Sequence, residues 1–117
     1  MIGEAGQLGL LRLPQADLTP GKLRPVLLIA QVPGRHGDWL VCRVTSQLHQ
    51  AVSGFDDVIT PAAADFVQSG LKVASVVRVG RLAVVEAELV QGVLGAVSSD
   101  RLRQVRLRLG EWLRSGA

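Results

Sequence analysis

Hydrophobic residues along the chain fall mostly into short runs that polar, glycine-containing or proline-containing segments separate. The clearest run, Val26 to Ala30, consists of five apolar residues and follows the turn formed by Gly21 to Pro25. A run this short, partly β-branched and bounded by turn formers, predicts a buried strand, because a helix would need about ten residues or more. Pro25 disfavours the helical region for Arg24 and cannot donate to a ladder. Arg24 is therefore predicted at an edge, where the strand begins.

Similar runs predict strands before and after this one. Gln7 to Leu13 alternates imperfectly between apolar and polar residues, and Trp39 to Thr45 follows a polar turn. We expect the Trp39 strand to pair with the Val26 to Gln31 strand as an antiparallel hairpin. Antiparallel pairing brings the start of one strand to the end of the next. Arg24 and Thr45 are therefore predicted at the same end of the sheet.

The second half of the chain predicts shorter elements. Ser46 to Gly54 is polar and lacks a period, which predicts a mobile loop. The next expected elements are a strand at Asp57–Thr60, a helical turn at Pro61–Phe66 that ends by Gly70, and a hairpin or bent strand across Ala74–Glu86, centred on Gly80. The pattern of Glu88 to Val97 assigns no element.

The C-terminal segment is the one convincing helix. Ser98 or Ser99 can cap it, and Asp100 lies in its first turn. Five apolar residues recur at spacings of three and four and are predicted to form one face of this helix: Leu102, Val105, Leu109, Trp112 and Leu113. Arginines flank this stripe and are predicted to be a solvated basic face: Arg101, Arg103, Arg106, Arg108 and Arg114. The chain is thus expected to be mainly β with a C-terminal helix.

Length and composition bound the architecture further. The 117 residues predict a single domain, 1–117, and a composition of 48% hydrophobic but only 3% aromatic residues predicts an aliphatic core. Cys42 is the only cysteine, so an intrachain disulfide is excluded and a reducing compartment fits best. No apolar run reaches the roughly eighteen residues of a membrane span. We expect a cytoplasmic protein without a membrane partner.

Candidate chemistry is sparse. His36 and His49 have no cysteine or carboxylate at metal-ligand spacing, so no metal site and no cofactor are predicted. No phosphate-binding glycine loop and no Gly-x-Ser-x-Gly nucleophile motif occur. The formal net charge is +3, and eleven of the thirteen basic residues are arginine, whose planar fork suits phosphate contacts. A codon bias explains the same excess of arginine equally well.

What remains is Arg24 together with Thr45, Ser46 and Gln47, and here the chain resembles a family, the MazF/PemK toxin ribonucleases. The order and spacing of several segments carry the resemblance, which extends from about Gly6 to Leu113. They are Leu13-Pro14, Asp17-Leu18, Gly21 to Val26, Val44 to Gln47, Ser69 to Lys72, Ser75 to Arg78, Leu82, and Gly95 to Ser98 before the terminal helix.

The resemblance implies a small SH3-like β-barrel of the MazF/PemK/CcdB type that acts as a homodimer. It also implies a toxin endoribonuclease that cuts single-stranded RNA without a metal and is held inactive by a cognate antitoxin. Arg24 and Thr45 would be the catalytic residues of this family pattern. The residues expected to bind RNA are Arg12, Thr19, Lys22, Ser46 and Gln47.

The residue types suit this chemistry on their own terms. RNA supplies its own nucleophile, the ribose 2′-OH, so a protein need only orient the phosphodiester and stabilise the developing charge. Arginine is a poor general base because its pKa is about 12 or higher. Arg24 is therefore assigned mainly to electrostatic stabilisation, with proton donation as a second role, and Thr45 to a hydrogen bond with the phosphate. The base is left unassigned between water and a loop residue.

Some positions depart from the family pattern. Gln7 replaces an acidic residue, and Gln15-Ala16 replaces an aromatic and a hydroxyl residue, for which Thr19 is the nearby alternative. Two competing functions therefore stay open. One is a catalytically degraded barrel that binds nucleic acid or a protein partner, and the other is a toxin of the same fold that poisons a protein such as gyrase. The pairing of Arg24 with Thr45 favours the ribonuclease over both.

Overall fold

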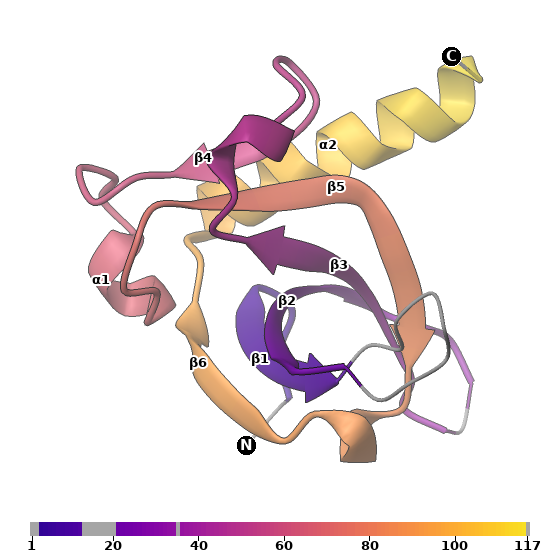
Figure 1. Cartoon of the computed structure of the whole chain (residues 1–117). Coiled ribbons are helices and arrows are strands. Elements are labelled where there is room, and N and C mark those ends of the chain that lie inside the picture. The colour runs from indigo at the N-terminus through magenta and orange to yellow at the C-terminus, as the bar shows by residue number, and fades with distance from the viewer. Residues whose placement is uncertain (1–2, 13–20, 35, 117) are drawn as a thin grey trace.

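A computed structural model describes residues 3–12, 21–34 and 36–116 (Figure 1). In these parts of the chain six strands form one sheet in the order β4-β5-β3-β2-β1-β6, and every neighbouring pair is antiparallel. The strands are β1 (Gln7–Arg12), β2 (Leu23–Gln31), β3 (Trp39–Thr45), β4 (Asp57–Ile59), β5 (Ser75–Val85) and β6 (Gly92–Ala96). The helical elements are η1 (Leu48–Gln50), α1 (Phe66–Ser69), η2 (Ala87–Leu89) and α2 (Ser99–Ser115).

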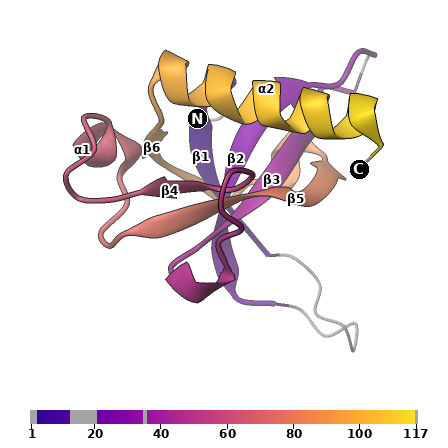
Figure 2. The same ribbon diagram turned by 90° about the horizontal axis from the view of Figure 1, so that it is seen from above.

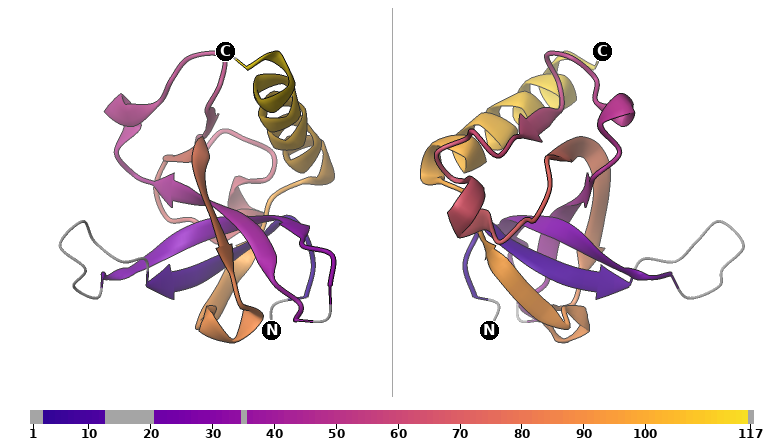
Figure 3. Two further views of the ribbon diagram at one scale, coloured as in Figure 1. Left: turned by 90° about the vertical axis from the view of Figure 1, so that its right-hand side faces the viewer. Right: turned by 60° about the vertical axis from the view of Figure 1, so that its left-hand side comes forward.

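The sheet curls into a half-barrel, and α2 lies across one side of it (Figures 2 and 3). This arrangement confirms the predicted mainly β class with a C-terminal helix and its barrel-like form. The short turn η1 lies on the opposite side of the sheet from α2. No helix in the described residues is long and apolar enough to cross a membrane.

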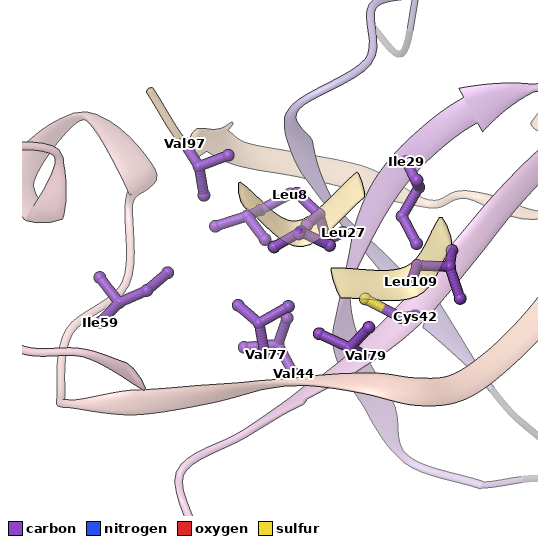
Figure 4. Packing of buried hydrophobic residues seen from close by; sticks show 11 residues of the cluster. Leu8, Leu27, Ile29, Cys42, Val44, Ile59, Val77, Val79, Val97 and Leu109 are labelled. Atoms are coloured by element: carbon purple, nitrogen blue, oxygen red, sulfur yellow. The ribbon is translucent and has the colours of Figure 1, made fainter. Parts of the chain in front are cut away.

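Two apolar clusters occupy the two faces of the sheet, because successive side chains of a strand point to opposite faces. The larger cluster packs beneath α2, and Figure 4 shows its members drawn from β1, β2, β3, β5 and α2. The smaller cluster lies on the other face and consists of Leu11, Val26, Leu28, Trp39, Val41 and Val85. Along β3, for example, Cys42 and Val44 belong to the larger cluster, whereas Trp39 and Val41 belong to the smaller.

The predicted hairpin is present, although β2 starts earlier than expected. β3 has the predicted bounds, and Val26 lies opposite Arg43 in the β2–β3 register. β2 begins at Leu23, so Arg24 lies inside a strand and pairs with Leu11 of β1. The predicted edge position of Arg24 holds only on the side that faces β3, because β2 is an interior strand whose other side pairs with β1 at Arg24. Pro25 is tolerated because the pairing with β3 begins only at Val26, one residue later.

The second half of the sequence decides one open alternative and shows two further differences from expectation. The bent-strand alternative is the right one for β5, whose register against β3 shifts between Arg78 and Leu82. The predicted helical turn is displaced: α1 is Phe66–Ser69, and the predicted Gly70 caps its end with a φ of 75°. Gly95 of β6 faces this turn so closely that a Cβ there would collide with the Gln68 carbonyl oxygen. The predicted mobile loop after β3 contains η1.

The C-terminal helix begins where predicted and packs mostly as expected. The Ser98 side chain caps it by accepting a hydrogen bond from the Arg101 amide at 3.1 Å. On α2, Val105 and Leu109 are buried on the face that packs on the sheet. Leu113 is 63% exposed and therefore does not belong to the apolar stripe. Trp112 still packs against the larger cluster and makes an edge-to-face contact with Phe55, so the stripe reaches the fourth turn without Leu113.

The expectation of a solvated basic face was wrong for Arg101 and Arg108, which are only partly exposed, whereas Arg106 stays exposed although it contacts the sheet. Arg101 contacts Asp65 through two hydrogen bonds, of 2.7 and 2.9 Å, and reaches Asp57 at 2.8 Å. Arg106 donates to the Ile29 carbonyl, and Arg108 donates to the Asp56 carbonyl. Arg103 and Arg114 are exposed, and their ion pairs are with Asp100 and Glu111 of the same helix. Sequence periodicity missed the difference because the buried carboxylates lie far away in sequence.

Asp65 anchors the start of α2, and its charge should matter for stability. Hydrogen bonding to Arg101 holds the pKa of Asp65 below its ordinary value, so the folded state favours the charged carboxylate. A depressed folded-state pKa stabilises the fold above about pH 4, the unfolded value, and this contribution is lost as the pH falls further.

We expect Asp65→Asn to lower the free energy of unfolding by roughly 3 kcal/mol at neutral pH, because it leaves Arg101 without its main partner. The variant should also lose less stability than the wild type between neutral pH and pH 3. Asp100→Asn, whose side chain is 88% exposed, is the matched control and should cost under about 1 kcal/mol. Urea unfolding at both pH values measures these effects, and equal stabilities for Asp65→Asn and wild type would contradict them.

Candidate functional site

Three neighbouring strands change from apolar to polar at the same level on one face of the sheet. Along β3, Trp39 and Val41 are buried in the smaller cluster, and the next two residues on that face are Arg43 and Thr45. β2 changes in the same way, from Leu28 and Val26 to Arg24, and β5 changes from Val85 and Ala83 to Arg81. The register sets Arg43 opposite Arg78, so Arg78 shares this face. The pleat therefore collects arginines from three strands on the face away from α2.

These residues line one cleft with a volume of about 520 Å³. Its lining, among the described residues, is Arg24, Arg43, Thr45, Gln47, Gln50, Arg78 and Arg81. Arg24 and Thr45 thus meet as the hairpin geometry predicts: two positions beyond the Val26–Arg43 pair, an unbroken register would set them opposite each other.

The Thr45 hydroxyl is oriented by its own turn. Its Oγ1 accepts a hydrogen bond from the Gln47 amide at 3.2 Å. An amide can only donate, so the hydroxyl hydrogen of Thr45 remains available for an acceptor in the cleft. This arrangement suits a donor to a phosphoryl oxygen better than a proton acceptor.

The arginines of the cleft differ in how they are held. The Arg78 Nε donates to Asp56 Oδ2 at 2.9 Å, and its Nη1 donates to Gln50 Oε1 at 2.8 Å. Within residues 3–12, 21–34 and 36–116, no carboxylate lies within ion-pair distance of Arg24, Arg43 or Arg81. The cleft is therefore strongly cationic, and an anion is the natural ligand.

Other predicted site residues lie outside this lining. Lys22 and Ser46 are exposed, and they lie close in sequence to the cleft residues Arg24 and Thr45. The Arg12 Nη1 donates to the Gly21 carbonyl at 3.1 Å, so it helps to hold the start of β2. Thr19 lies outside the described residues.

Sequence reasoning missed Arg43, Gln50, Arg78 and Arg81. The predicted strands contain Arg43 and Arg78, but a strand prediction alone does not say which face of the sheet each side chain occupies. The period of two along β3 would have placed Arg43 beside Thr45. Arg78 and Arg81 needed the shifted register of the bent strand, which no sequence signal specifies.

Neither a thiol nor a metal cluster accompanies the cleft. Cys42 is fully buried, and burial raises the pKa of its thiol to about 12, so it remains protonated and inert at neutral pH. Among the described residues, no three His, Cys, Asp or Glu side chains are grouped so that they could hold a metal ion. Arginine, threonine and glutamine are the groups that the described lining offers for chemistry.

A family model described as "PemK-like, MazF-like toxin of type II toxin-antitoxin system" matches residues 4–113. No curated protein matches the chain.

Solved structures share the fold along nearly the whole chain. MazF (Form-I) from Deinococcus radiodurans has 28% identity and a TM-score of 0.65, with 97% of each chain covered. A MazE-MazF structure (Form-II) from the same organism has 28% identity and a TM-score of 0.67, with 97% of this chain and 96% of that chain covered. An endoribonuclease in complex with its cognate antitoxin from Mycobacterial species has a TM-score of 0.69 at 14% identity, covering 96% of this chain and 95% of that one. At 14% identity this last likeness concerns the fold alone.

Proposed function

The chain belongs to the family of PemK-like, MazF-like toxins of type II toxin-antitoxin systems, and from this premise we propose that it is an endoribonuclease. In this proposal it cleaves single-stranded RNA in a sequence-selective manner, without a metal, by attack of the ribose 2′-OH. The observation that carries the proposal is the meeting of Arg24 and Thr45 in one cationic cleft.

The geometry supports phosphodiester binding by charge and by hydrogen-bond direction. Arg24 offers a planar fork of donors that matches the oxygens of a phosphate, and it has no ion-pair partner among the described residues. Thr45 offers its free hydroxyl hydrogen. Both groups donate hydrogen bonds, and a phosphodiester needs such donors because its oxygens can only accept.

The reaction needs little from the protein beyond this. The 2′-oxygen forms a bond to phosphorus while the bond to the 5′-oxygen breaks, which yields a 2′,3′-cyclic phosphate and a 5′-OH. Negative charge grows on the phosphoryl oxygens and on the leaving oxygen, where Arg24 and Thr45 stabilise it. The described lining contains no carboxylate or imidazole, and the group that removes the 2′-OH proton stays unassigned.

Cleavage should be metal-independent and should require ribose at the scissile position. Incubation with a mixture of single-stranded RNAs, followed by mapping of the new ends, should yield 2′,3′-cyclic phosphate and 5′-OH termini with and without chelator. A deoxyribose at the mapped position removes the nucleophile and should block cutting there. Loss of activity in EDTA, or cutting of the deoxy substrate, would contradict the mechanism. RNA binding without any cutting would favour the degraded, binding-only barrel.

Arg24→Ala and Thr45→Val should each lower kcat/KM on the order of a hundredfold or more, because each removes a transition-state contact. Arg24→Lys should also be impaired, since a point charge does not reproduce the guanidinium fork. Thr45→Ser keeps the hydroxyl and serves as the control that stays active. Melting temperatures should remain close to wild type, since Arg24 is exposed and Val matches the shape of Thr. Wild-type rates for Arg24→Ala or Thr45→Val would remove that residue from the site.

Two partners follow from the same proposal: a second copy of the chain and an antitoxin. Edge strands β4 and β6 leave open sheet edges, and a symmetric dimer is the commonest way to cover apolar surface. The MazE-MazF structure from Deinococcus radiodurans supports an antitoxin partner. A disordered acidic segment of such a partner would compete with RNA for the cationic cleft.

Sedimentation at micromolar protein, alone and with a small acidic protein encoded beside this one, tests both partners. We expect a dimer alone and a larger complex with the added protein, which should also suppress RNA cutting and dissociate as salt rises. A monomer would contradict the first proposal. Unchanged sedimentation on mixing would contradict the second.

A further inference from the structure

Two arginines lie directly opposite each other on neighbouring strands beside the proposed site. The β3–β5 register pairs Arg43 with Arg78, and both side chains line the cleft. Side chains opposite each other on antiparallel strands have Cβ atoms about 5 Å apart, and like charges in such a pair destabilise the sheet. The sheet thus holds a repulsive pair in the cleft that Arg24 and Thr45 also line.

Asp56 relieves this repulsion only in part. Its side chain is 1% exposed, and Oδ2 accepts from both Arg78 Nε and the Val52 amide while Oδ1 accepts from the Val79 amide. The backbone contacts and the Gln50 contact hold Arg78 in one position at the wall of the cleft. Asp56 neutralises Arg78, but neither Arg43 nor Arg81 has a carboxylate partner among the described residues.

The charge of the cleft exceeds what one phosphate can neutralise. Four of its lining residues are arginines and one of these is paired with Asp56, which leaves three uncompensated positive charges among the described residues. A single phosphodiester at Arg24 and Thr45 carries one negative charge. The remaining two positive charges, at Arg43 and Arg81, call for further anionic groups on the same ligand.

The positions also suit a chain of phosphates. Arg43 precedes Thr45 by two residues on the same face of β3, which separates their Cα atoms by about 6.6 Å. That separation is comparable to one nucleotide of an extended backbone. A cleft of about 520 Å³ is much larger than one phosphate ion.

Resting on the proposed function, we propose that Arg43 and Arg81 form a second phosphate site next to Arg24 and Thr45. This site binds the backbone phosphate that flanks the scissile one in single-stranded RNA. Arg78, which lies on β5 with Arg81 and opposite Arg43, is held by Asp56 and lines the same cleft. The second site holds the RNA in register for cleavage and contacts no base edge, so it contributes affinity without sequence preference.

The salt dependence of RNA binding tests this inference without requiring cleavage. The probe is a fluorescein-labelled 2′-O-methyl RNA of mixed sequence, about ten nucleotides long, which fits the usual single-strand site sizes and has no free 2′-OH to attack. Fluorescence anisotropy between about 50 and 200 mM salt gives the slope of log affinity against log salt. Each phosphate contact on a single strand contributes about 0.7 to this slope.

Because Arg43 and Arg81 bind the same phosphate, Arg43→Gln and Arg81→Gln should each reduce the slope, and the double variant should reduce it by about 0.7 in total. Arg43→Lys keeps the charge and should keep the slope. Arg103→Gln is the matched control, because Arg103 lies on α2, is 68% exposed and pairs with Asp100, so the slope should not change.

Slopes for Arg43→Gln and Arg81→Gln that equal those of wild type and Arg103→Gln would overturn the second site, even if the protein cuts RNA. A wild-type protein that cuts nothing, but whose slope falls in both variants, would contradict the proposed ribonuclease and support the phosphate site. Absence of probe binding by wild type would overturn the inference.

Discussion

The pairing register of β2, β3 and β5 is the constraint on which the rest of this structure depends. Side chains alternate between two faces, and a slip of one residue would exchange those faces along a whole strand. The present register buries one apolar cluster beneath α2 and a second on the opposite face, and directs Arg24, Arg43 and Arg81 into the same cleft. The free energy gained by burying the apolar ends of these strands thus fixes the positions of their cationic ends.

The elements outside the three strands reinforce this arrangement. Arg106 of α2 donates to the Ile29 carbonyl, next to the register shift between Leu28 and Ala30. Asp56 holds both the Val79 amide and Arg78 where β5 bends. Two of the three register shifts in the described part of the sheet are therefore tied by charged side chains. Removing such a tie would shift the cleft as well as weaken the fold.

Local pattern predicted the parts of the fold that depend on neighbours in sequence. The bounds of β3, the Ser98 cap and the terminal helix followed from short runs, capping chemistry and helical spacing. The hairpin topology alone was enough to bring Arg24 to Thr45. What sequence could not supply were long-range ion pairs: Asp65 and Arg101 are 36 positions apart, and no periodicity links them. Sequence also could not supply the position of Arg78 opposite Arg43, because that register depends on the bend of β5.

The central claim is that Arg24 and Thr45 act on one phosphate because the sheet brings them together. A double-mutant cycle on RNA cleavage tests it most directly, by comparing kcat/KM for wild type, Arg24→Ala, Thr45→Val and the double variant. Residues that act as a unit are strongly non-additive, so the double variant should be little slower than the slower single variant. Losses that multiply in full, as expected for two independent sites, would contradict the account.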